Sequence, residues 1–140
     1  MDNMMIEVTS HYVGLLVYDY EEQHDCFLTK RNEIIIPKGM EIPLAVTMEI
    51  YPHKNFKKDK ALLKIGITES NGPETNPRFA KKLWSELIHL DSDYPIDKPL
   101  QLICTLDKNH ILGVKIINLL TNKEIFCLNE SVRKIEKFFV

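Results

Sequence analysis

The side chains with most capacity for chemistry are a short run of potential metal ligands and two cysteines in apolar surroundings. His24, Asp25 and Cys26 are adjacent in a polar stretch. Zinc ligands usually come in spaced pairs, so three neighbours are a weak motif and a solvated loop is the favoured interpretation. Cys104 and Cys127 lie at apolar positions of expected strands, where cysteine packs as a small hydrophobe. No histidine pattern indicates that either thiol is a nucleophile.

The sequence also lacks the motifs that accompany phosphate binding or hydrolysis. Its 5 glycines are scattered and fit neither a P-loop nor a dinucleotide-binding fingerprint. It contains no GxSxG nucleophile motif and no HExxH metal motif. We therefore expect a protein that is not an enzyme, with no catalytic residue, no cofactor or metal requirement, and no ATP hydrolysis.

Composition narrows the class further. The 140 residues are 44% hydrophobic and 27% charged with a net charge of −2, which is typical of one globular domain and gives no overall basic field for nucleic acid. No apolar run reaches the roughly 20 residues of a membrane helix, so no membrane association is expected. The first residues carry no basic segment of a signal peptide, and 3 cysteines without CxxC spacing suit reduced thiols. These features favour a cytoplasmic protein.

Period-two patterns predict that the elements carrying these residues are mainly β-strands. Short β-rich runs cover residues 6–8, 13–18, 26–29, 34–36 and 61–67. The longest alternation runs from Met40 to Ile50 and predicts a strand with one buried face. Pro43 has no N–H group, so that end of the strand is expected to be an edge or a bulge. Runs at 100–106, 111–119 and 125–128 predict a three-stranded meander.

One segment changes period and predicts an α-helix over about residues 77–91. Asn76 is a good N-cap residue, and Pro77 suits the first position of a helix. Apolar residues then recur at helical spacing: Phe79, Leu83, Leu87 and Leu90, with Trp84 and Ile88 widening the stripe. We expect Phe79, Leu83 and Leu87 to pack this helix against the sheet.

Several motifs, in order, resemble the peptide-binding β-domain of Hsp70 chaperones. In residues 95–124, a proline-rich entry leads to an alternating strand that ends at Asp107, and then to a turn, Ile111-Leu-Gly-Val114 and a second turn. Upstream, three shorter motifs are similar to the opening strands of that domain: Glu7-Val8-Thr9 with Val13-Gly14-Leu15, Lys30-Arg31-Asn32 through Ile36-Pro37, and Ala45 to Ile50. The resemblance spans most of residues 6–128 and implies a single antiparallel β-sandwich domain over residues 1–140.

The chain also departs from the family pattern. Residues 37–45 are too few for the strand and arch loop that the family has there. Residues 70–94, which contain the expected helix, replace a short loop. The 140 residues include no ATPase domain, interdomain linker or helical lid. Two alternatives remain: a piece of a longer chaperone with an ATPase domain, or a free-standing relative without control by ATP.

The resemblance implies binding of short, extended, apolar peptides such as segments of unfolded proteins. By position in the family pattern, the peptide cleft would be lined by Leu15, Val17, Tyr18, Val46, Met48 and Leu100. Apolar residues at inward strand positions are also simply core, so each assignment competes with a packing role. The acidic stretch 19–25 is expected to border the cleft and favour peptides with basic flanks. The alternative function is a non-catalytic scaffold that docks a fixed partner through a strand edge or the helix.

Overall fold

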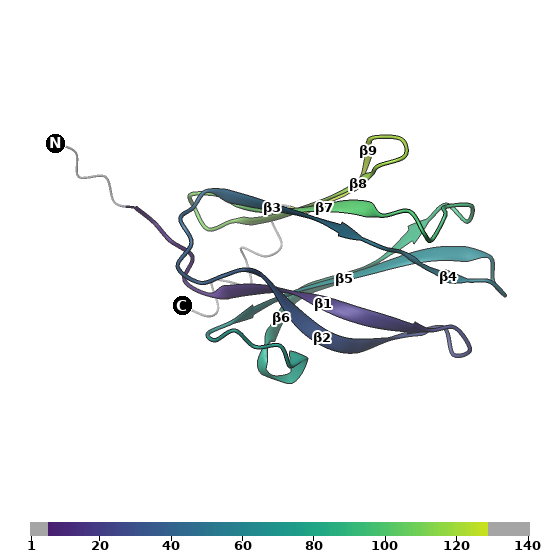
Figure 1. Ribbon diagram of the computed structural model, residues 1–140, viewed down its shortest axis with the longest axis horizontal. Coiled ribbons are helices and arrows are strands. Elements are labelled where there is room, and N and C mark those ends of the chain that lie inside the picture. Colours follow the sequence, from purple (N-terminus) through teal and green to yellow (C-terminus); the bar gives the residue numbers. More distant parts are fainter. Residues whose placement is uncertain (1–5, 129–140) are drawn as a thin grey trace.

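Two antiparallel β-sheets face each other, as in a β-sandwich (Figure 1). The computed structural model describes residues 6–128. The first sheet consists of β1 (Tyr12–Glu21), β2 (Cys26–Ile36), β4 (His53–Asn55), β5 (Lys60–Ser70) and β6 (Lys81–Leu90). Its order is β2-β1-β5-β4, and β6 pairs with the edge of β5 opposite to β1. The second sheet has the order β3-β7-β8-β9; its strands are β3 (Leu44–Ile50), β7 (Leu100–Leu106), β8 (Leu112–Asn118) and β9 (Lys123–Leu128).

The strands predicted from period-two patterns are confirmed, including the meander β7-β8-β9, except that the run at residues 6–8 forms no strand. The alternating run from Met40 contributes its second half as β3, which starts at Leu44 directly after a cis Ile42–Pro43 peptide bond. β3 is an edge strand, as the position of Pro43 indicated, because it pairs only with β7. The residues just before β3 are held by Val8, which forms an isolated bridge with Glu41.

The predicted helix over residues 77–91 is wrong. Asn76 does cap a helical turn, since its side chain accepts a hydrogen bond from the backbone N–H of Arg78, but the turn is a 3-10 helix limited to Pro77–Phe79. The chain then becomes extended and forms β6. Residues 6–128 include no helix of the length and hydrophobicity needed to cross a membrane.

β6 is a strand because it pairs with β5 along nearly its whole length, from Ala61↔Leu90 to Glu69↔Lys81. Backbone pairing over this distance satisfies the peptide groups that a helix would satisfy internally. Of the residues expected to dock the helix, only Leu83 is buried, whereas Phe79 is 69% exposed and Leu87 is 42% exposed. The apolar residues of β6 therefore reach the core through strand geometry.

The core lies between the sheets and is built from inward-facing aliphatic side chains of both layers. Its fully buried members come mainly from β5 and from the meander: Ile65, Ile67, Leu100, Leu102, Cys104, Val114 and Ile116. One side of the interface is closed by the stacked rings of Trp84 in β6 and Phe126 in β9, whose centroids lie 5.4 Å apart. The opposite side, between β2 and β3, has no such aromatic pair among the described residues.

A buried polar contact joins three neighbouring strands of the first sheet, β2, β1 and β5. The hydroxyl of Thr68 in β5 donates to Asn32 Oδ1 in β2 at 2.6 Å, across Gly14 of β1. The amide of Asn32 also donates to the carbonyl of Glu74 at 2.8 Å. Gly14 is required at the crossing point, because a Cβ atom there would collide with both Asn32 and Thr68. This contact fixes the position of Gly14, which directly precedes Leu15, a residue that lines the cleft described below.

Candidate functional site

A cleft of about 750 Å³ lies between the sheets, bounded by β3 on one side and by β1 and β2 on the other. The middle of β5 forms its inner wall through Leu63, Lys64 and Ile65. The cleft contains most of the residues that the sequence predicted for peptide binding: Leu15, Val17, Tyr18, Val46 and Met48. Residues more than 25 positions apart in sequence therefore line one common space.

The β3 wall of the cleft is apolar on its inward face, and Thr47 and Glu49 also contribute to the lining. Val46, Met48 and Ile50 face inward and are half-buried, and they alternate with the exposed residues Ala45, Thr47 and Glu49. The inward side chains remain partly accessible because β3 is the edge of its sheet and the cleft opens in front of them. Residues on the inward face of a strand usually end up fully buried, so this partial exposure distinguishes the cleft from the core.

The β1 wall forms where β1 separates from β5. The two strands pair only from Tyr12↔Ser70 to Leu15↔Ile67, and beyond Leu15 β1 pairs with β2 alone. Tyr18 lies across the resulting gap, with the ammonium group of Lys64 5.4 Å from its ring centroid. Gly66 permits this close approach, since a Cβ atom there would collide with the Tyr18 hydroxyl. Tyr18 and Lys64 thus place an aromatic ring and an ammonium group side by side in this part of the cleft wall.

Leu100 is the one predicted cleft residue that the structure places elsewhere. Its side chain is 0% exposed and belongs to the core cluster, and it does not line the cleft. β7 lies between β3 and β8, so the inward face of Leu100 is covered by neighbours on both sides. The structure therefore places Leu100 in the core rather than in the cleft, where it packs between the sheets.

His53 is a cleft residue that sequence reasoning missed. It lines the cleft from β4, and its Nδ1 atom is buried without a hydrogen-bond partner in the described part of the chain. Its ring lies 5.6 Å from that of Phe27 and 6.0 Å from that of Tyr20. Burial lowers the pKa of His53 below its ordinary value, while the nearby carboxylate of Asp19 opposes that shift. The only sequence signal was a histidine beside a lysine-rich loop, which usually indicates the surface.

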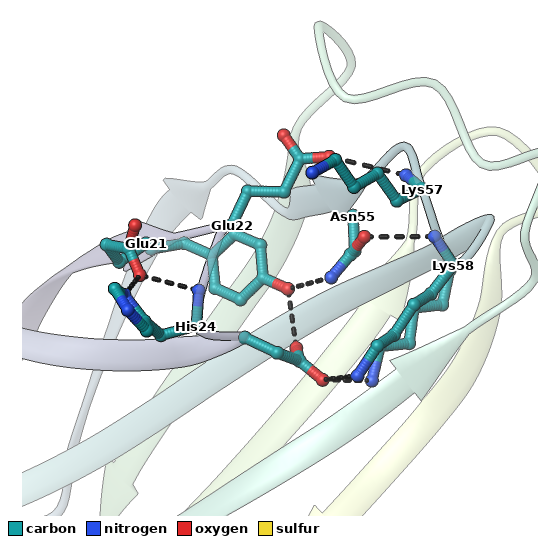
Figure 2. A network of polar contacts seen from close by, with 9 residues as sticks. Glu21, Glu22, His24, Asn55, Lys57 and Lys58 are labelled. Carbon is teal, nitrogen blue, oxygen red and sulfur yellow. Dashed lines mark hydrogen bonds and ion pairs between the residues drawn. The ribbon is translucent and has the colours of Figure 1, made fainter.

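The tip of the β1–β2 hairpin is tied to the β4–β5 hairpin by a polar network (Figure 2). Asp25 receives hydrogen bonds from Lys60 Nζ at 2.8 Å, Lys58 Nζ at 2.9 Å and the Tyr20 hydroxyl at 2.5 Å. The Tyr20 oxygen in turn accepts a hydrogen bond from the Asn55 side chain at 2.8 Å. The bonds from Lys60, Tyr20 and Lys58 hold the pKa of Asp25 well below its usual range.

The other carboxylates of this acidic stretch also have partners within the chain. Glu22 accepts a hydrogen bond from the backbone N–H of Phe56 at 2.7 Å, and Glu21 accepts one from the backbone N–H of His24 at 2.7 Å. Figure 2 shows the Glu21 carboxylate at the backbone N–H of His24, and the Glu22 carboxylate at the backbone N–H of Lys57, which donates to it at 3.4 Å. Within stretch 19–25, the side chains of the lysine-rich loop form ion pairs with Asp25 alone, whereas Glu21 and Glu22 accept backbone hydrogen bonds. Less free negative charge is left at this hairpin tip than the sequence implied, and the preference for peptides with basic flanks stays a prediction.

Replacing Asp25 with asparagine tests this network through acid stability. A carboxylate whose pKa is lower in the folded than in the unfolded state stabilises the fold. This stabilisation is complete at pH values above the unfolded pKa, about 3.9, and is progressively lost as the pH falls from there toward the folded pKa. Asp25→Asn should therefore have a lower melting temperature than the native protein at pH 7, with the difference shrinking toward pH 3. Differential scanning fluorimetry across this range measures it.

The matched control for this prediction is Asp97→Asn, since Asp97 is an exposed aspartate outside the network. This control should differ little from the native protein at either pH. A constant difference between Asp25→Asn and native protein from pH 7 to pH 3 would contradict the role of the Asp25 charge.

The structure places the residues considered for metal or thiol chemistry in separate surroundings. In residues 6–128, no group of three His, Cys, Asp or Glu side chains is arranged to hold a metal ion. His24 contacts Glu21, whereas Asp25 contacts the two lysines. Cys104 is buried in the core, and burial raises the pKa of its thiol to about 12. Cys127 is exposed, so its expected core position is wrong.

The comparisons with known proteins leave the cleft as the main guide to function. No protein-family model matches the chain, and a search of curated proteins finds no match. The resemblance to the Hsp70 domain therefore rests on the ordered motifs quoted above. The cleft is the structural feature that brings separated segments of the chain around one space.

Proposed function

We propose that the protein binds short, extended, apolar peptide segments in the cleft, as a relative of the Hsp70 substrate-binding β-domain. The observation that supports this most is the convergence of Leu15, Val17, Val46 and Met48 on one partly open apolar space. Concave, largely apolar spaces of about 300–1,000 Å³ are typical of ligand sites. The mixed charges at the rim, Arg31, Glu33 and Glu49, favour neither basic nor acidic ligands.

The affinity should be modest. Burial of one leucine side chain contributes about 1.5–3 kcal/mol, and a few such side chains fit the cleft. Association costs at least about 4 kcal/mol in lost translational and rotational freedom, and ordering a flexible peptide adds to that cost. Micromolar or weaker binding is therefore expected, which suits transient capture of many apolar segments better than a permanent complex.

Val46→Phe tests the proposal by placing a bulky side chain in the cleft. Loss of one leucine-sized subsite corresponds to roughly tenfold to hundredfold weaker binding. The measurement is fluorescence anisotropy with a labelled leucine-rich heptapeptide. Ala45→Phe is the matched control, because Ala45 is the exposed neighbour on the opposite face of β3 and its variant should bind as the native protein does.

Two outcomes would contradict the proposal in different ways. Equal binding by native protein and Val46→Phe would place the peptide outside the cleft. No binding by the native protein at high micromolar peptide would favour the second candidate, a scaffold that docks a fixed partner. That candidate is supported by the unpaired edge of β3 and would now use a strand edge, because the helix that was its other docking element is absent from residues 6–128.

A further inference from the structure

The outer edge of β3 is open to backbone pairing. β3 pairs with β7 from Leu44↔Leu106 to Ile50↔Leu100, and no other strand of the described chain pairs with its opposite side. No backbone hydrogen bond from a turn or loop of residues 6–128 reaches residues 44–50 either. Every second N–H and C=O group of β3 therefore points outward without a backbone partner, which makes the edge a template for another strand.

β3 carries less protection than the other edge strands, since its one charged residue is Glu49 and its nearest proline, Pro43, lies just before it. Natural proteins discourage strand addition with lysine, proline or a covering loop at the edge. The edge of β2 is covered where the backbone N–H of Asn32 donates to the carbonyl of Thr75 at 2.8 Å. The remaining edges carry basic residues, namely Lys54 in β4, Lys81 and Lys82 in β6, and Lys123 in β9. β3, with the sequence LAVTMEI, has no lysine, arginine or proline.

The open edge and the cleft lie side by side along the same strand. The inward residues Val46, Met48 and Ile50 line the cleft, and Leu15 and Val17 of β1 form the wall opposite. A strand added to β3 would continue its pleat, so every second side chain of that strand would turn toward the cleft. Backbone pairing gives affinity without sequence preference, and the pocket beside it selects side chains.

We propose that an extended peptide with apolar side chains at every second position adds to β3 as a further strand of the second sheet, with those side chains filling the cleft. This rests on the proposed function and assigns its binding mode. A second copy of the chain is the competing occupant of the same edge, and its pairing is one outcome of the test below.

An N-methyl scan of the heptapeptide tests this mode. N-methylation removes one backbone donor and adds bulk at that position. Only every second N–H of an added strand faces its neighbour, so methylation should weaken binding about tenfold at alternate positions and little at the positions between. A matching pattern is expected in β3, where peptide binding should slow hydrogen exchange of the amides in residues 44–50 that point to the free edge.

The outcomes separate this mode from the proposed function. If the unmodified peptide binds but no methylated position shows the alternating loss, strand addition is wrong while the cleft remains the binding site. If the unmodified peptide does not bind, the proposed function itself fails. If β3 amides are already protected without peptide and the protein sediments as a dimer, a second copy occupies the edge and the proposal is overturned.

Discussion

Leu100→Ala should lower the free energy of unfolding by about 2–5 kcal/mol, the usual range for large-to-small changes at fully buried positions. Leu100 is 0% exposed and pairs with Ile50 on one side and Asn118 on the other, so the cavity left behind has little room to collapse. For a protein of this size the loss corresponds to roughly 6–20 °C in melting temperature. Thermal or urea unfolding followed by circular dichroism measures it.

Leu120→Ala is the matched control, because Leu120 is 56% exposed and the same atoms are removed. Its stability should stay close to that of the native protein. Peptide affinity of Leu100→Ala, measured well below its melting temperature, should also be nearly unchanged. If Leu100→Ala instead weakened peptide binding at native stability, Leu100 would belong to the cleft and the packing described for β7 would be incorrect.

Gly14→Ala should cause a loss of similar size for the opposite reason. The added Cβ atom has no space between Asn32 and Thr68, and overpacking of this kind costs about 1–3 kcal/mol. Moving either side chain also breaks the buried hydrogen bond between them, and an unsatisfied buried polar group costs about another 1–3 kcal/mol. Urea unfolding of the variant gives the combined effect.

Gly72→Ala provides the comparison for Gly14→Ala. The nearest atom to a Cβ at Gly72 is Glu74 Oε1 at 3.5 Å, which is ordinary van der Waals contact. Gly72→Ala should therefore unfold at nearly the same urea concentration as the native protein. Similar midpoints for the two variants would show that β1, β2 and β5 can shift apart at Gly14, and the tight crossing of these strands would be refuted.

The strands were predictable because alternation is a local signal that directly reflects one buried face. The run from Leu44 to Ile50 illustrates this, since its apolar residues occupy the inward positions that the pattern assigned. The candidate cleft residues on β1 and β3 came from their position in the family pattern, and the structure places them around one space. Leu100 could not be separated from them, because a pattern identifies the inward face but not whether a neighbouring strand covers it.

The helix prediction failed because a local signal was extended beyond its range. Asn76 and Pro77 start a helical turn, as predicted, but such caps do not decide how far the helix continues. Trp84, Ile88 and Leu90 also fit the period of two that is typical of a strand. The exposed Glu86 interrupts this alternation, so the apolar residues of the segment match helical spacing better than strand spacing. Pairing with β5 decides the outcome, and tertiary pairing is invisible in a single segment.

The polar parts of the site were equally hidden from sequence. The acidic stretch and the lysine-rich loop each suggested a solvated surface, yet Asp25 meets Lys58 and Lys60 from more than 30 residues away. His53 faces the cleft only because β4 turns beside the β1–β2 hairpin. These contacts depend on which hairpins become neighbours, and no spacing within either hairpin specifies that.

The pairing of β3 has a consequence for the order in which the protein assembles. The β1–β2, β5–β6 and β7–β8–β9 units each join strands that are neighbours in sequence, whereas Leu44 meets Leu106 only after a loop of 61 intervening residues has closed. Closing so long a loop is entropically costly, so contacts of this kind form late in folding and dominate its rate. β3 is thus a strand whose detachment leaves all the sequence-local units intact. A peptide held against β3 would be held by this late-forming strand, and its residence time would be linked to how long β3 itself stays docked.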